Sequence, residues 1–236
     1  MDDVTDPLAS APWRRFAVLG DSIAEGIGDP ADGYPDGGWA DAVATALDRA
    51  RPGLEYRNLG ARGLLAEEVR ETQLDAALAF EPDLAAVSAG GNDLLAPGFD
   101  GPGVEEELDE MVGALRGAGA DVVTFGLFDI TTTGLVPEPY AEELHRRLRE
   151  LSDRAAAVAR RRGAIHIDAT SHPVGADPSI YSADLRHLNA IGHTVFTAEV
   201  LKALSARSGA FLVPPASPGR AASRRWRRAR ATYQPT

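Results

Sequence analysis

The chain has 236 residues, of which 44% are hydrophobic, and it contains no cysteine. This length suits one domain with a substantial core, and the lack of cysteine excludes disulfides, a thiolate nucleophile and cysteine-bound metal. The net charge of −11 conceals an asymmetry, because residues 220–236 hold six arginines and no acid, which leaves −17 on residues 1–219. Such an acidic body disfavours nucleic acid and anionic lipid as partners, and favours a neutral or cationic small molecule.

Short apolar runs alternate with helical patterns along the chain. We expect strands at 15–20, 54–59, 83–89, 121–127 and 164–168, and helices near 38–50, 64–80, 103–118, 139–162 and 190–206. Each strand is followed by a helix, which is typical of right-handed crossovers and a parallel sheet covered on both faces. The sequence therefore predicts an α/β fold with three layers, α/β/α, around a five-stranded parallel sheet of flavodoxin-like winding.

The two ends of the chain carry no pattern of a folded domain. The start has neither a basic region nor an apolar run, and no segment approaches the roughly 20 apolar residues of a membrane span. We therefore expect a cytoplasmic protein with no membrane span. Residues 208–236 are rich in proline and arginine, and we interpret them as a disordered basic tail. Attachment of this tail to nucleic acid or to an anionic surface is an alternative, non-enzymatic function.

A serine follows the first predicted strand within the segment Gly20-Asp21-Ser22-Ile23-Ala24-Glu25-Gly26. Glycines on both sides allow backbone N–H groups to turn toward its hydroxyl, as a nucleophile requires. A serine in such a turn is equally typical of a helix N-cap. The partners of Ser22 elsewhere in the chain must therefore decide between the two interpretations.

An unactivated serine hydroxyl needs a base, and the base needs a group that holds its tautomer. Asp184 and His187 stand three residues apart after the fifth predicted strand and suit these roles. A surface pair that caps the next helix is the alternative. Donors for an oxyanion are available from the backbone N–H of Ser22, from a glycine in the segment 58–63, and from the side chain of Asn92.

Together these segments resemble the four sequence blocks of the SGNH/GDSL hydrolases, in the same order along the chain. The resemblance covers about residues 15–206 and implies Ser22 as nucleophile, His187 as base and Asp184 as its orienting acid. It also implies an oxyanion hole made by Ser22, Gly63 and Asn92, because Gly63 lies five residues after the asparagine of the second block. Ile23 replaces the leucine of the family name, and Leu188 replaces a proline that often follows the histidine.

The resemblance predicts a catalytic domain over residues 1–207 that needs no metal and no cofactor. We expect a serine esterase acting on a small-molecule ester with a small or medium acyl group, through an acyl-enzyme intermediate. Acyl transfer to an alcohol or amine of a metabolite, and hydrolysis of a thioester, are alternatives with the same triad. Further contacts with the substrate are expected from Asp21, Phe128 and Asp129. The oligomeric state is left open by the sequence.

Overall fold

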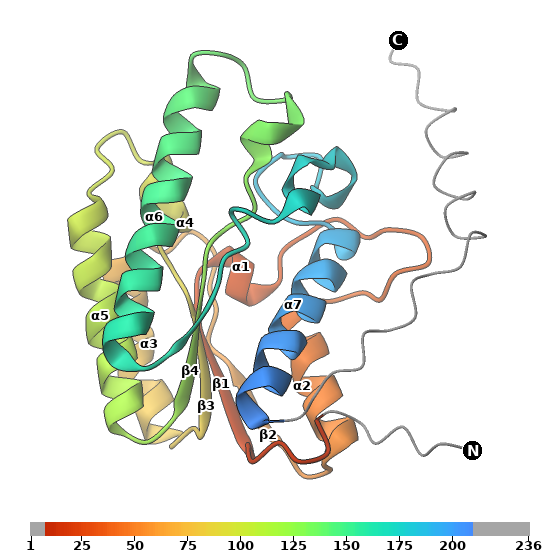
Figure 1. Cartoon of the computed structure of the whole chain (residues 1–236), viewed down its shortest axis with the longest axis vertical. Helices are drawn as coiled ribbons and strands as arrows, with labels where there is room; N and C mark the ends of the chain where they lie inside the picture. The colour runs from red at the N-terminus through yellow and green to blue at the C-terminus, as the bar shows by residue number, and fades with distance from the viewer. Residues whose placement is uncertain (1–7, 210–236) are drawn as a thin grey trace.

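In the computed structural model, which describes residues 8–209, five strands form one parallel sheet in the order β2-β1-β3-β4-β5 (Figure 1). The strands are β1 (Arg15–Gly20), β2 (Glu55–Asn58), β3 (Leu84–Ser88), β4 (Asp121–Phe125) and β5 (Ile165–Ile167). Each predicted strand contains an observed one, and the strand order is the flavodoxin-like winding. The predicted fold class is therefore confirmed. The predicted tail lies outside the described residues apart from Ser208 and Gly209.

Seven α-helices lie in the described part of the chain. They are α1 (Ser22–Glu25), α2 (Trp39–Ala50), α3 (Ala66–Ala79), α4 (Gly91–Leu95), α5 (Gly101–Gly117), α6 (Tyr140–Arg162) and α7 (Ala190–Ser208). Three short 3₁₀ helices, η1 (Ile130–Thr133), η2 (Pro173–Ala176) and η3 (Pro178–Ile180), lie in loops. The sequence predicted the five long helices and neither α1 nor α4. These two helices span four and five residues, too few to show an apolar period.

The sheet separates two hydrophobic cores (Figure 1). On one face, Phe16 and Val18 of β1 belong to the core that includes α2 and α7. On the other face, Leu19 of β1 and Val87 of β3 belong to the core under α3, α5 and α6. All five residues of β3 are buried, as expected for a central strand covered on both sides.

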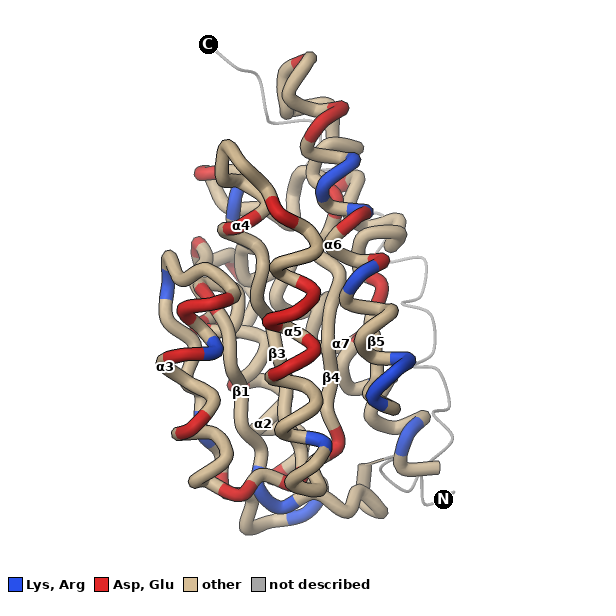
Figure 2. The backbone as a smooth tube through the Cα atoms, turned by 90° about the vertical axis from the view of Figure 1, so that its left-hand side faces the viewer, with Lys and Arg blue, Asp and Glu red and all other residues tan. Residues whose placement is uncertain are grey.

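Helix α6 shows how the sequence specifies this packing. Its buried positions include Leu148, Leu151, Ala155 and Val158, which recur every three or four residues and so share one face of the helix. The opposite face carries charge, and Figure 2 shows basic residues along α6 beside acidic residues of α5. Ion pairs join the two helices, such as Arg154 with Glu105 at 2.8 Å. None of the helices within residues 8–209 is long and apolar enough to cross a membrane.

The register of the central strands brings two of the sequence blocks together. Gly20 at the end of β1 pairs with Ser88 at the end of β3. The short helices α1 and α4 that follow these strands carry Ser22 and Asn92, so both residues lie at the carboxyl edge of the sheet. In sheets of this winding, that edge is where ligands bind.

Candidate active site

The hydroxyl of Ser22 is presented by a tight turn between β1 and α1. Gly20 has a φ of +150°, and a Cβ atom built there would lie 2.1 Å from the carbonyl oxygen of Ser88. Only glycine therefore fits this approach of the two backbones. The Asp21 side chain caps α1 by accepting a hydrogen bond from the N–H of Ile23 at 2.9 Å. Ser22 thus begins the helix, and Asp21 rather than Ser22 is its N-cap.

A glutamine that the sequence analysis did not identify fixes the start of this turn. The side chain of Gln73 on α3 is buried, and its Oε1 accepts a hydrogen bond from the Gly20 N–H at 2.8 Å. Its Nε2 donates to the Gly20 carbonyl oxygen at 2.9 Å. Gln73 stands in a buried series with Val69 and Ala77 at a spacing of four. A polar residue at such an apolar position was the available signal.

His187 and Asp184 lie within hydrogen-bond distance of Ser22 and of each other. Nε2 of His187 is 2.9 Å from Oγ of Ser22, and Nδ1 is 2.6 Å from Oδ2 of Asp184. A carboxylate only accepts, so Nδ1 carries the hydrogen and Nε2 is left free to accept the serine proton. Ser22 therefore forms a continuous hydrogen-bonded chain with two residues that lie far from it in the sequence.

Local backbone contacts hold the Asp184 carboxylate in place. Its Oδ1 accepts hydrogen bonds from the N–H groups of Arg186 and His187 at 2.9 and 3.1 Å. Leu185, between Asp184 and Arg186, has a φ of +55°, which closes the loop tightly. Burial by itself would raise the pKa of Asp184, but these N–H groups and the His187 ring together lower it. Asp184 is therefore ionised at neutral pH, as a partner for an imidazolium must be.

The predicted oxyanion donors lie around the same pocket as Ser22 and His187. Gly63 has a φ of +83°, and Asn92 belongs to α4. One hydrogen of the Asn92 amide is donated to the carbonyl oxygen of Leu64 at 2.9 Å, which leaves the second for a ligand. Both residues line the pocket, as Ser22 does. Gly60, the other glycine of this segment, packs instead against the backbone of Ala24 and Glu25.

The pocket itself is a cavity of about 350 Å³ that begins at Ser22 and is walled largely by apolar side chains. Many of these come from α4, from the end of the β4–η1 segment and the start of η1, and from α6: Leu94, Leu127, Phe128, Ile130, Leu144 and Leu148. A concave apolar site with a few convergent polar groups is typical of a small-molecule site. Of these apolar residues, the sequence analysis named only Phe128. The others were missed because they carry no motif.

The other two expected substrate contacts differ in position. Asp21 lines the pocket, is buried, and has its pKa raised to about 6 by that burial, against the opposing hydrogen bond from Ile23. Asp129 is buried as well, but its carboxylate is directed to Thr131 and His145 and does not line the pocket. The substrate contact expected for Asp129 stays a prediction.

His193 ties the loop after Ser22 to α2 and α7. Its ring is buried, Nδ1 accepts a hydrogen bond from the Trp39 N–H at 3.3 Å, and Nε2 donates to the Ile27 carbonyl oxygen at 3.1 Å. Ile27 in turn donates its N–H to the Ser22 carbonyl oxygen. These contacts use the neutral ring, and burial lowers the pKa of His193. Its role here is structural, as a clamp that holds the loop after Ser22.

This clamp predicts a loss of stability in acid. The unfolded imidazole takes up a proton near pH 6.5 while the folded one resists it, so the unfolded state binds more protons below that pH. We expect the free energy of unfolding, measured with urea, to fall less between pH 7.5 and 5.5 in His193→Gln than in the wild type. An equal fall of the free energy of unfolding in the two proteins would show that His193 is not the source of the acid sensitivity.

A second group of serine, histidine and aspartate lies under α6 and differs in its arrangement. Oγ of Ser152 is 3.4 Å from both Nε2 of His166 and Oδ1 of Asp168. Nδ1 of His166 meets the hydroxyl of Thr124 rather than a carboxylate, and none of these residues lines the pocket. This group lacks the serine, histidine, acid order needed to activate a nucleophile. Among residues 8–209, no three His, Asp or Glu side chains gather as a metal site requires.

A family model and several solved structures match this chain. The model of the GDSL-like lipase/acylhydrolase family matches residues 18–195. No curated protein matches the sequence.

Several solved structures share the fold. One titled TesA is 24% identical, with a TM-score of 0.64, and the match covers 81% of this chain and 98% of that one. A lipase/acylhydrolase from Enterococcus faecalis is 21% identical, with a TM-score of 0.64 and coverage of 82% and 96%. The acetylxylan esterase Axe2 from Geobacillus stearothermophilus is 15% identical, with a TM-score of 0.67 and coverage of 81% and 94%. At these identities the likeness shows the fold alone.

Proposed function

Because the chain belongs to the GDSL-like lipase/acylhydrolase family, we propose that this hydrolase is a serine esterase for carboxylic esters of small or medium acyl groups. The proposal rests above all on one observation. Ser22, His187 and Asp184 form a hydrogen-bonded chain, with distances of 2.9 and 2.6 Å, at the mouth of an apolar pocket. The roles of nucleophile, base and orienting acid follow from this order.

In the proposed reaction, Oγ of Ser22 attacks the acyl carbonyl carbon while Nε2 of His187 takes its proton. The carbonyl oxygen becomes an oxyanion that accepts hydrogen bonds from the N–H groups of Ser22 and Gly63 and from the Asn92 amide. His187 then gives the proton to the leaving alcohol as the ester bond breaks, which leaves an acyl-Ser22 intermediate. Water, deprotonated by the same imidazole, attacks this intermediate and releases the acid.

The pocket supports an acyl group rather than a charged substrate portion. Most of the side chains that line it are apolar, with Arg62 and Arg186 as its basic residues, and fully burying a methylene against the apolar ones contributes about 0.8 kcal/mol. The acidic body does not attract anionic substrates over long range. A neutral ester with an alkyl acyl chain fits both features.

Two measurements test the esterase proposal directly. We expect the wild type to hydrolyse 4-nitrophenyl esters, and a fluorophosphonate probe to label Ser22, as located by peptide mass spectrometry. Labelling at another serine, or no hydrolysis of any ester, would contradict the proposal. Transfer to an added alcohol that outruns hydrolysis would instead favour the acyltransferase alternative.

Removing the Asn92 amide tests the oxyanion assignment. We expect Asn92→Ala to lower kcat for ester hydrolysis by about 10²–10³-fold with little change in KM, because an oxyanion donor acts mainly in the transition state. The same change removes the hydrogen bond to Leu64. The melting temperature must therefore be measured beside kcat. A fall in stability with kcat unchanged would leave Asn92 with a structural role only.

A further inference from the structure

Part of the pocket wall is formed where two separate elements meet. Phe128 comes from the segment between β4 and η1 and Ile130 begins η1, while Leu144 and Leu148 come from α6. Leu144 and Leu148 are four residues apart, so they lie on one face of the helix, directed toward the same space. The width of the pocket at this place therefore depends on how closely η1 approaches α6.

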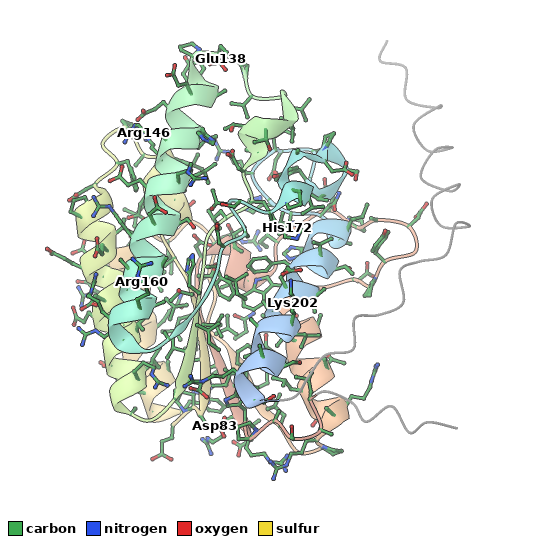
Figure 3. All side chains as sticks on the ribbon, viewed as in Figure 1. Asp83, Glu138, Arg146, Arg160, His172 and Lys202 are labelled. Carbon is green, nitrogen blue, oxygen red and sulfur yellow. The ribbon has the colours of Figure 1, made fainter. Side chains whose placement is uncertain are left out.

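One side-chain hydrogen bond joins these two walls directly. Asp129 stands between Phe128 and Ile130, and its Oδ2 lies 2.5 Å from Nδ1 of His145. His145 follows Leu144 on α6, in the turn marked by Arg146 in Figure 3. The side chain of Asp129 is 3% exposed and that of His145 is 47% exposed. The bond thus links a buried carboxylate behind one wall to a solvent-facing imidazole beside the other.

The other oxygen of Asp129 organises η1 itself. Oδ1 accepts hydrogen bonds from the N–H of Thr131 at 3.0 Å and from its hydroxyl at 2.5 Å. A buried carboxylate without partners is costly, so these contacts hold Asp129 in one orientation. Two of the hydrogen bonds of this carboxylate thus stay within η1, and the one with His145 reaches α6.

From this arrangement we propose that Asp129 and His145 are positioning residues for acyl-chain selectivity. Their hydrogen bond holds η1 against α6 and so sets the width of the pocket between Phe128, Ile130, Leu144 and Leu148. The inference rests on the proposed esterase function, but it concerns which acyl chain is accepted and not how the ester is cleaved. Neither residue lines the pocket or contacts Ser22.

The size of the cavity indicates which substrates would report on this contact. A volume of about 350 Å³ holds on the order of a dozen water-sized groups at about 30 Å³ each. An octanoyl chain would use much of this space and reach the wall. An acetyl group ends one carbon beyond the carbonyl and leaves the wall untouched.

Steady-state kinetics with 4-nitrophenyl acetate and 4-nitrophenyl octanoate test the proposal. We expect His145→Ala to lower the octanoate-to-acetate ratio of kcat/KM about threefold to tenfold, mainly through the KM for octanoate. His145→Asn should restore most of the ratio, because its Nδ2 is bonded to Cγ as Nδ1 is in histidine. Arg149→Ala is the matched control: it lies one turn further along α6, exposed, with no side-chain hydrogen bond or ion pair to residues 8–209.

Each outcome decides the proposal. An unchanged ratio in His145→Ala, an equal loss with both esters, or no restoration in His145→Asn would overturn it, as would the same effect in Arg149→Ala. His145 is exposed, so His145→Ala should remain folded, which circular dichroism checks. If the wild type hydrolysed neither ester, the esterase function would fail first and the selectivity proposal with it. Selectivity is thus separable from esterase activity.

Discussion

Replacing Ser22 with alanine is expected to lower kcat for ester hydrolysis on the order of 10⁶-fold, while the protein stays folded. Without Oγ no acyl-enzyme can form, and any remaining turnover must come from direct attack by water in the pocket. Within residues 8–209 the Ser22 hydroxyl has one side-chain partner, Nε2 of His187. Its loss therefore leaves the turn and the hydrogen bonds between Gln73 and Gly20 in place. The rate should therefore change far more than the melting temperature.

The chain offers a matched control in Ser152. This serine is also buried, and its hydroxyl also lies near a histidine and an aspartate, His166 and Asp168. It does not line the pocket, so Ser152→Ala should keep kcat within about threefold of the wild type whatever its effect on stability. Retention of a substantial fraction of activity in Ser22→Ala, or an equal loss in Ser152→Ala, would contradict the assignment of the nucleophile.

The sequence predicted the parts of the fold that depend on local periodicity. Short apolar runs identified the five strands, and the recurring apolar positions of α6 identified a helix that covers the sheet. The motifs also brought Ser22, Gly63, Asn92 and His187 to one pocket, because the carboxyl ends of parallel strands meet at one edge. Short-range patterns and topology were sufficient for these features.

The features that the sequence did not predict depend on contacts between distant segments. Gln73 reaches Gly20 across 53 positions, and Asp129 meets His145 across a loop and the start of α6. The apolar wall of the pocket uses leucines that look like any other core residue in the sequence. Such side chains acquire a function only from what the fold places opposite them, and no local pattern reports that.

Replacing His187 with alanine is the other change with a very large expected effect. The variant keeps the serine hydroxyl but removes the imidazole that, in the proposed reaction, takes its proton and later protonates the leaving alcohol. We expect kcat to fall on the order of 10⁶-fold, similar to Ser22→Ala. His166→Ala is the matched control, because that ring also lies beside a serine but outside the pocket. A fall of less than about tenfold in His187→Ala would contradict the role of His187 as the base.

The double variant Ser22→Ala/His187→Ala gives the sharper measurement. If the two groups act as one unit, removing the second after the first costs almost nothing, because the residual reaction uses neither. If each contributed independently, the two losses would multiply to an immeasurably slow rate. The hydrogen bond of 2.9 Å between Oγ and Nε2 predicts the first result. We therefore expect single-turnover hydrolysis of 4-nitrophenyl acetate to be equally slow in both single variants and in the double variant.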